Sequence, residues 1–166
     1  MSFVILGSHG FVAQSLKNFL ISKNKKNLAI SKNQINFLKK NSSLKLKKIL
    51  IKKKNCTLVI TSSIAPAKNL DDYLSNIKII GNIIKGINVK NIKKLIYISS
   101  DAVYSDTKKK ITEISYTEPT SMHGMMHLHR ENLLKNSFYK KLLILRPTLL
   151  YGKNDTHNSY GPNQFM

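Results

Sequence analysis

The chain has 166 residues, of which 42% are hydrophobic, and this suits one domain with an ordinary buried core. No apolar run approaches the roughly 18 residues that span a bilayer. The N-terminal apolar run stops at Gly7 and has no basic region before it, so it is not typical of a signal peptide. The single cysteine, Cys56, excludes an internal disulfide. We therefore expect a cytoplasmic protein with no membrane partner.

The formal charge of +20 raises the question of a nucleic-acid partner. Only Arg130 and Arg146 are arginines among the 28 basic residues, whereas sequence-specific nucleic-acid sites depend on arginine forks. The lysines are scattered, and this pattern is typical of solvated helix faces and loops. We expect no specific nucleic-acid partner, and a polyanion-binding face is the less favoured alternative.

Short apolar runs and helical spacings alternate along the sequence. In chain order they predict a strand at 3–6, a helix at 11–21, a strand at 28–30, a helix at 44–51, a strand at 57–60, a helix at 70–87, a strand at 95–98, a helix at 122–136 and a strand at 142–145. This alternation indicates βαβ units. We therefore expect an α/β fold in which helices cover both faces of a parallel sheet, in three layers.

A glycine turn joins the first predicted strand to the first helix, with the sequence Gly7-Ser8-His9-Gly10-Phe11-Val12-Ala13. Glycine allows the tight reversal and the close approach of a pyrophosphate, and the helix N-terminus offers free N–H groups to phosphates. The spacing is G-x-x-G-x-x-A instead of the general G-x-G-x-x-G, so a purely structural turn is the alternative. The turn favours a Rossmann-like, doubly wound nucleotide-binding fold.

Further segments follow in an order that resembles the extended short-chain dehydrogenase/reductase family, also called the NAD-dependent epimerase/dehydratase family. The resemblance runs from Phe3 to about Gly152, and its most similar piece is the segment 99–104. The matching pieces are the glycine turn, Ser62-Ser63-Ile64-Ala65 after the family's fourth strand, Asn76 with Gly81, Ser99-Ser100-Asp101-Ala102-Val103-Tyr104, Glu118-Pro119-Thr120, and Arg146-Pro147-Thr148-Leu149-Leu150-Tyr151-Gly152 after the family's sixth strand.

The resemblance implies an NAD(P)-dependent epimerase, dehydratase or reductase that acts on a sugar nucleotide. Hydride would pass between a nicotinamide dinucleotide and a sugar carbon. The residues implied in cofactor binding are Gly7, Ser8, His9, Gly10, Phe11, Val12, Ser62, Ser63, Ile64, Asn76, Ser99 and Pro147.

The catalytic pattern of the family is altered in this chain. The family uses a Tyr-x-x-x-Lys pair, and alignment from Ser100 places His123 and His127 at these two positions. Ser100 would hold the substrate oxygen, and Asp101 stands where dehydratase-like members carry an acid. His123 could move the proton, since imidazole titrates near neutral pH, and His127 could bind the ribose. A catalytically impaired dinucleotide-binding or scaffold protein is the equal alternative.

Other roles for these side chains are less favoured. His123, His127 and Glu131 are spaced i, i+4, i+8 and could ligate a metal, but Glu131 is also where the family has a structural glutamate, so we expect no metal site. Tyr104 and Tyr116 could donate protons, although packing is the favoured role of both. His129 faces another direction and is expected at the surface.

The residues after the second strand bear on the choice of cofactor. An acidic residue there would hold the ribose hydroxyls of NAD. This chain has Ser31 and Lys32, and a hydroxyl with a cation suits the 2′-phosphate of NADP. We therefore favour NADP over NAD.

The domain organisation follows from the same resemblance. Residues 1–152 are expected to form the NAD(P)-binding domain, and 153–166 to begin an incomplete substrate-binding region. The chain would thus be truncated before the C-terminal substrate lobe. The family dimerises through the helices predicted at 70–87 and 122–136, so a homodimer is expected.

Overall fold

The computed structural model describes residues 2–107, 110–152 and 155. Five strands alternate with four helices, and the predicted elements are all present. They are β1 (Phe3–Leu6), α1 (Phe11–Ser22), β2 (Asn27–Ile30), α2 (Ser42–Lys52), β3 (Cys56–Ile60), α3 (Leu70–Gly86), β4 (Ile92–Ile98), α4 (Met122–Phe138) and β5 (Leu142–Leu145), with short 3-10 turns η1 (Val89–Asn91), η2 (Asp101–Val103) and η3 (Tyr139–Lys141).

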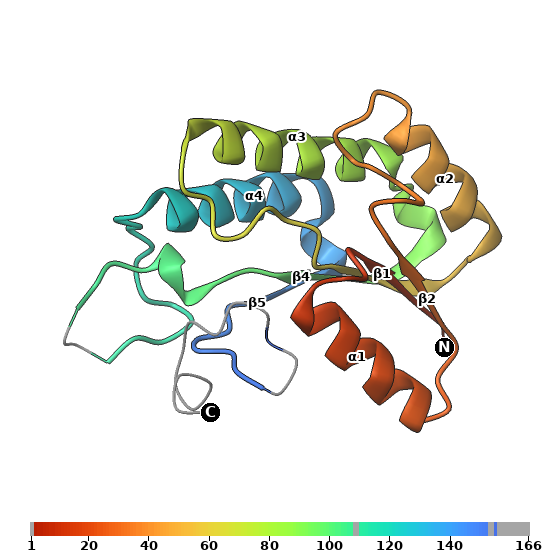
Figure 1. Cartoon of the computed structure of the whole chain (residues 1–166), viewed down its shortest axis with the longest axis horizontal. Coiled ribbons are helices and arrows are strands. Elements are labelled where there is room, and N and C mark those ends of the chain that lie inside the picture. The colour runs from red at the N-terminus through yellow and green to blue at the C-terminus, as the bar shows by residue number, and fades with distance from the viewer. Residues whose placement is uncertain (1, 108–109, 153–154, 156–166) are drawn as a thin grey trace.

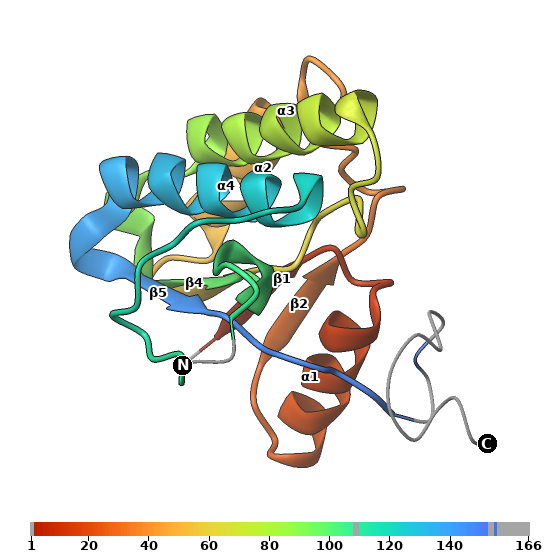
Figure 2. The same cartoon turned by 90° about the vertical axis from the view of Figure 1, so that its left-hand side faces the viewer.

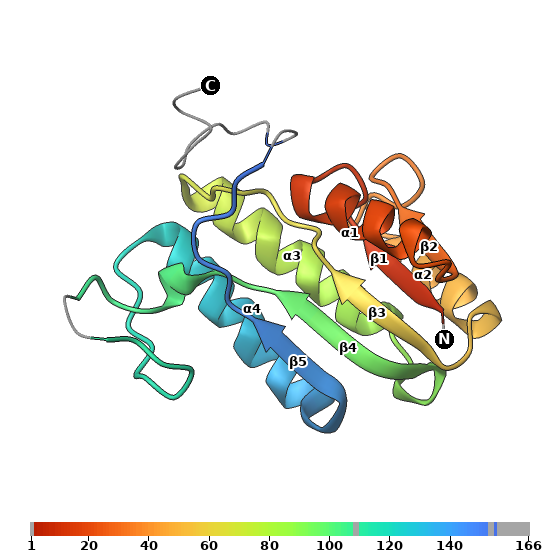
Figure 3. The same ribbon diagram turned by 90° about the horizontal axis from the view of Figure 1, so that it is seen from below.

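The strands form one parallel sheet in the order β2-β1-β3-β4-β5 (Figure 3). The register places Leu6 beside both Ile30 and Ile60, so β1, β2 and β3 end at the same level. The loops that begin after these strands therefore share one edge of the sheet. The winding direction reverses between β1 and β3, which is the topological switch point where such sheets bind ligands.

Helices cover both faces of the sheet, as expected for a three-layer α/β/α fold. Helices α2, α3 and α4 lie on one face and α1 lies on the other (Figures 1 and 2). The larger core, on the three-helix side, includes Leu46 of α2, Ile80 of α3 and Leu134 of α4. The smaller core packs Ala13 and Leu20 of α1 onto the sheet. The prediction of a Rossmann-like doubly wound sheet is confirmed.

The strand numbering of this chain differs from that of the family pattern. The family resemblance placed the strand before Arg146 sixth, but in the described residues it is the fifth, and the strand before Ser62 is the third.

The connection from β2 to α2 forms turns, because Asn36 Oδ1 accepts the Leu38 N–H at 3.0 Å and competes with a strand ladder. Ile35 and Phe37 are buried in the core without pairing to the sheet.

The glycine turn depends on Gly7 for two reasons. Its φ of +99° lies in the left-handed region that L side chains rarely adopt. A Cβ at this position would also lie 2.8 Å from the backbone nitrogen of Ser62, so the loop after β3 could not approach. Gly7 therefore fixes the distance between the two loops at the switch point.

Replacing Gly7 tests this constraint. We expect Gly7→Ala to lower the free energy of unfolding by about 2 kcal/mol, since it combines backbone strain with a steric clash. Gly81→Ala is the matched control, because no atom lies within 4 Å of its Cβ position inside α3. The control should raise stability by about 0.5–1 kcal/mol. Urea denaturation measures both, and an unaltered stability of Gly7→Ala would contradict the interpretation.

Candidate functional site

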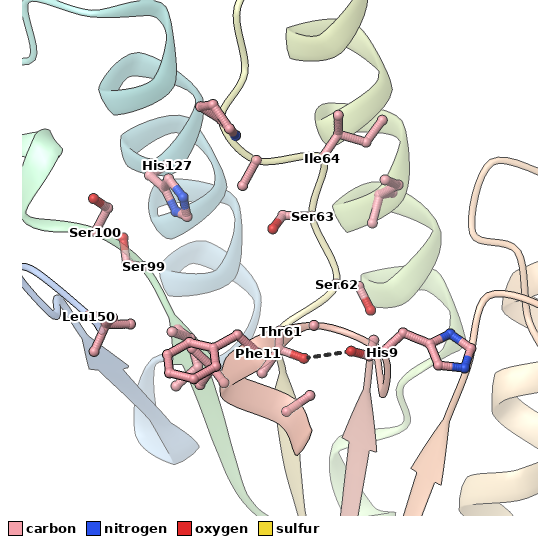
Figure 4. Close-up of a pocket in the computed structure, with 18 of the residues that line it drawn as sticks. His9, Phe11, Thr61, Ser62, Ser63, Ile64, Ser99, Ser100, His127 and Leu150 are labelled. Carbon is pink, nitrogen blue, oxygen red and sulfur yellow. Dashed lines mark hydrogen bonds between the residues drawn. The ribbon is translucent and has the colours of Figure 1, made fainter. Parts of the chain in front are cut away.

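A cavity of about 600 Å³ lies at the carboxyl ends of the strands (Figure 4). Its walls come from the loops after all five strands and from the start of α4. Most of the residues predicted from the sequence line it: Gly7, His9, Gly10, Phe11, Val12, Ser31, Lys32, Ser62, Ser63, Ile64, Ser99, Ser100, Asp101, His123, His127 and Pro147. The structure thus brings together side chains that are up to about 140 residues apart in sequence.

Two predicted binding residues, Ser8 and Asn76, are not part of the cavity lining. Asn76 is fully buried in α3. Its Oδ1 accepts the Ile64 N–H at 3.0 Å, and its Nδ2 donates to the Ile64 carbonyl at 2.9 Å. Asn76 therefore holds the loop that lines the cavity, and its position gives it an indirect role in any ligand site.

The N-terminus of α1 opens toward the cavity at Gly10. Gly10 is the N-cap of α1, and no side chain caps the helix there. The nearest atom to a Cβ on Gly10 would be the Gly7 oxygen at 3.7 Å, so the fold leaves this space open. The first-turn N–H groups of a helix lack intrahelical partners, and they favour an anion at this place.

Ser31 and Lys32 follow β2 at the same edge. The Ser31 N–H donates to Gln34 Oε1 at 2.8 Å, which fixes the turn. Lys32 is exposed and also lines the cavity. A cation at this end of the cavity can meet a phosphate group on a ligand.

A buried network connects β4, α4 and β5 behind the cavity. Glu131 is fully buried, and both of its oxygens accept hydrogen bonds from Arg146, at 2.9 and 2.6 Å. Ser99 Oγ donates to Glu131 at 2.6 Å. Arg146 also donates to the hydroxyl of Tyr104 at 2.5 Å. These bonds hold the ends of β4 and β5, from which Ser100 and Pro147 enter the site.

The network keeps Glu131 ionised. Burial acts to raise the pKa of Glu131, but hydrogen bonds from Arg146 and Ser99, together with the charges of Arg146 and Lys135, lower it below its ordinary value. The hydrogen bond to Glu131 correspondingly raises the pKa of Arg146. The pair is thus a bidentate, charge-assisted contact in a site with little solvent.

The two histidines stand at the start of α4. The Cβ of a residue in place of Gly124 would lie 2.0 Å from the Ala102 oxygen, so this glycine lets α4 approach η2 closely. His123 Nδ1 accepts the Ala67 N–H at 3.3 Å, and His127 Nδ1 lies 2.7 Å from the Tyr97 hydroxyl. In the view of Figure 4 the His127 ring extends from α4 between Ser100 and Ser63.

Burial lowers the pKa of both histidines. Burial and the nearby Arg130 charge lower the pKa of His127 to about 2. Burial also lowers the pKa of His123, although Asp101 opposes this change. Burial raises the pKa of Tyr97 to about 12, so its hydroxyl stays protonated.

Ser100 and Asp101 line the same cavity as the histidines, with Ser100 as the N-cap of η2 and Asp101 as its first residue. Ser100 Oγ accepts the Ala102 N–H at 3.1 Å and donates to Asp101 Oδ1 at 3.2 Å. The Ser100 hydroxyl thus already has a donor and an acceptor within its own turn, and a ligand would share it.

The less favoured roles find no support in the geometry. The Glu131 oxygens are occupied by Ser99 and Arg146, and within residues 2–107, 110–152 and 155 no three His, Cys, Asp or Glu side chains could hold a metal. Tyr104 is buried in the Arg146 network, whereas Tyr116 is 84% exposed. His129 is at the surface, and its Nδ1 lies 2.6 Å from the Tyr73 hydroxyl.

Tyr97 and Arg130, which support the site from behind, were not predicted as site residues from the sequence. Arg130 is fully buried; it donates to the Ser62 carbonyl at 2.6 Å and to Asn76 Oδ1 at 3.0 Å. Its guanidinium lies 5.2 Å from the centre of the Tyr97 ring. One signal was available, since Arg130 and Arg146 are the only arginines in so lysine-rich a chain. Both are used for multiple directed hydrogen bonds that lysine cannot form.

The sequence profile of the NAD dependent epimerase/dehydratase family matches residues 3–166. The chain belongs to this family. No curated protein sequence matches the chain. Among solved structures, dTDP-4-dehydrorhamnose reductase from Clostridium acetobutylicum is similar over 94% of this chain and 56% of that one, with 22% identity and a TM-score of 0.75.

Two further similar structures contain a bound cofactor. The dTDP-4-dehydrorhamnose reductase of Bacillus anthracis, in complex with NADP, is 18% identical, with a TM-score of 0.79 over 93% of this chain and 56% of that one. The UDP-glucose 4-epimerase of Thermus thermophilus, in complex with NAD, is 14% identical, with a TM-score of 0.78 over 98% of this chain and 59% of that one. At these identities the likeness shows the fold.

The chain thus spans little more than half the length of these relatives. The expected substrate-binding start at 153–166 lies, apart from Asp155, outside the described residues. None of the helices in the described part is long and apolar enough to cross a membrane.

The Glu131 network predicts a pH dependence of stability. Because its pKa is lower in the folded state, the Glu131 carboxylate stabilises the fold fully above the ordinary glutamate pKa of about 4.3, and this contribution disappears as the pH falls through the folded-state value. We expect Glu131→Gln to cost about 2 kcal/mol near neutral pH, and the difference from the parent protein to shrink in acid.

Urea denaturation between about pH 7 and about pH 3 measures this dependence. Glu113→Gln is the matched control, since Glu113 is exposed. A cost of Glu131→Gln that stays constant down to the lowest pH would show that the carboxylate charge contributes nothing.

Proposed function

We propose that this chain binds a nicotinamide dinucleotide, NADP or NAD, as the cofactor domain of an enzyme that acts on a sugar nucleotide. The observation that carries the proposal is the cavity at the switch point, which runs from the open N-terminus of α1 at Gly10 to the His127 side chain. Membership of the epimerase/dehydratase family and the cofactors named for related structures support it.

The residues present fit the parts of such a cofactor. The first turn of α1, which begins after Gly10, offers N–H groups without intrahelical partners, and the fold leaves space at Gly10 for the pyrophosphate. Ser31 and Lys32 lie where the adenosine ribose would be held, and the loop 62–64 would cover the adenosine. At the other end, Ser99, Pro147 and His127 would face the nicotinamide riboside. The bound cofactor would supply hydride chemistry, and the protein supplies its binding and orientation.

Two candidate roles remain for the histidine pair. In the first, Ser100 holds a sugar oxygen while His123 moves a proton during hydride transfer. In the second, the protein binds the dinucleotide without efficient turnover. One observation favours the second role, since the Nδ1 atoms of both His123 and His127 are already engaged by protein groups.

Two further expectations concern the whole protein. We propose a homodimer through α3 and α4, whose outward side chains include Leu70, Leu74 and Met125, all of them exposed. A cytoplasmic location likewise stays a prediction.

Binding of NADH and NADPH, followed by cofactor fluorescence, tests the proposal. Gly10→Ala is the informative variant, because its new Cβ meets no protein atom within 3.7 Å but enters the space assigned to the pyrophosphate. We expect its unfolding free energy to change by less than about 1 kcal/mol and its cofactor affinity to fall at least about tenfold. A folded parent protein that binds neither dinucleotide at millimolar concentration would overturn the proposal.

The preference for NADP predicts a selective effect of Lys32. We expect Lys32→Ala to weaken NADPH binding about fivefold and to leave NADH binding nearly unchanged, since only NADPH carries the 2′-phosphate. Lys39→Ala removes the same charge from an exposed residue outside the cavity lining and serves as control. If Lys32→Ala weakened the binding of both dinucleotides equally, Lys32 would not select NADPH over NADH.

A further inference from the structure

The hydroxyl of Tyr97 determines which nitrogen of His127 carries the proton. Tyr97 is 1% exposed, and its hydroxyl lies 2.7 Å from His127 Nδ1. In the part of the chain that the structure describes, this is the one hydrogen-bond partner of that hydroxyl. If Nδ1 carried the proton, the buried hydroxyl hydrogen would lose its acceptor, which is costly. Tyr97 therefore donates to Nδ1, and His127 carries its proton on Nε2.

A different donor fixes the position of the proton on His123. The backbone N–H of Ala67 can only donate, and it lies 3.3 Å from His123 Nδ1. Nδ1 must then be unprotonated, so His123 also carries its proton on Nε2. Both rings line the cavity, and their centres are 4.7 Å apart in an edge-to-face arrangement.

Burial opposes a second proton on either ring, and the positive charge of Arg130 adds to this effect. From α4 itself, Arg130 brings a buried positive charge, and within the described residues the carboxylate of Glu131 pairs with Arg146 and Lys135 and not with Arg130. From β4, Tyr97 is neutral, and from η2 the negative charge of Asp101 raises the pKa of His123. Burial, with the Arg130 charge, holds the pKa of His127 near 2, while Asp101 only partly offsets the lowering of the His123 pKa.

We propose that Tyr97, Ala67 and Arg130 hold His123 and His127 as neutral imidazoles protonated on Nε2, so that the pair binds ligand oxygens as fixed hydrogen-bond donors. Such a ring cannot accept a proton from an alcohol at Nε2, which already carries one. Loss of the Nε2 proton would leave a buried imidazolate anion. The pair therefore orients a hydroxyl or carbonyl oxygen without exchanging a proton with it. Tyr97 and Arg130 are positioning residues in this scheme.

The inference deepens the proposed function and rests on it only for the identity of the ligand. With a nicotinamide dinucleotide in the cavity, the oxygens that meet these donors are those of the nicotinamide ribose and of the sugar substrate. In the role of binding without efficient turnover, the histidine pair would thus orient these oxygens by hydrogen bonds alone.

Nitrogen-15 NMR of protein labelled at histidine reads the tautomers directly, without any ligand. We expect His123 and His127 to show a protonated Nε2 and an unprotonated Nδ1 from about pH 7 to about pH 8. Loss of one signal in His123→Gln and of another in His127→Gln assigns them. A proton on Nδ1 of either ring, or double protonation within this range, would overturn the proposal.

Tyr97→Phe tests the positioning role. It removes the hydroxyl donor, so the His127 tautomer should shift toward Nδ1 protonation while His123 keeps its state. Tyr73→Phe is the matched control, since it removes the analogous hydroxyl from the exposed His129 and should leave the His127 signals unchanged. An unchanged His127 tautomer in Tyr97→Phe would overturn the role of Tyr97. The tautomers of the parent protein decide the proposal if this variant does not fold.

Cofactor titration separates this inference from the proposed function. We expect His127→Leu to weaken NADH binding about tenfold, and His127→Gln, which keeps an N–H donor, to weaken it less. If the tautomers are as expected and the parent binds no dinucleotide, the proposed function fails and the histidine states stand. If the parent binds the dinucleotide with Nδ1-protonated rings, the inference fails alone.

Discussion

The position of one peptide unit, at Ser62, governs the geometry of the whole site. On one side the Ser62 backbone packs against Gly7, at a distance that leaves no room for a Cβ. On the other side its carbonyl accepts a hydrogen bond from Arg130, at 2.6 Å. Asn76 fixes the next part of the loop through both backbone groups of Ile64. The glycine turn and helix α4 are thereby held on opposite sides of a single loop, and the space between them is the cavity.

Two neighbouring charged residues on α4 have separate tasks in this arrangement. Glu131 forms a bidentate pair with Arg146 and ties α4 to the end of β5. The guanidinium of Arg130 contacts the Ser62 carbonyl, the Asn76 side-chain amide and the Tyr97 ring, and none of these is a carboxylate. A buried cation without a carboxylate is costly, and directed hydrogen bonds reduce that cost. The charge of Arg130 adds to the effect of burial and lowers the pKa of both adjacent histidines, so the same guanidinium supports the loop and influences the chemistry of the site.

The periodicity of apolar residues was enough to predict each strand and α-helix of the described residues, because burial on a sheet face or a helix stripe follows directly from residue spacing. The place of the site followed from the parallel sheet, since all loops after the strands share one edge. The supporting contacts could not be predicted in this way. Asn76 was assigned to the cofactor because of a motif, and the structure buries it against Ile64. Arg130 shows no distinctive spacing, and its partner at Ser62 is 68 residues away along the chain.

These long sequence separations connect folding with ligand binding. Thr61 donates to the Leu6 carbonyl across 55 residues, and Arg130 reaches Ser62 across 68, so the walls of the cavity meet only when the distant parts of the chain have come together. Pairings of this kind form late and are absent from the unfolded ensemble. A ligand that fills the cavity would therefore bind the folded chain alone and raise its melting temperature by mass action. The ligand would thus stabilise the folded state of the chain that binds it.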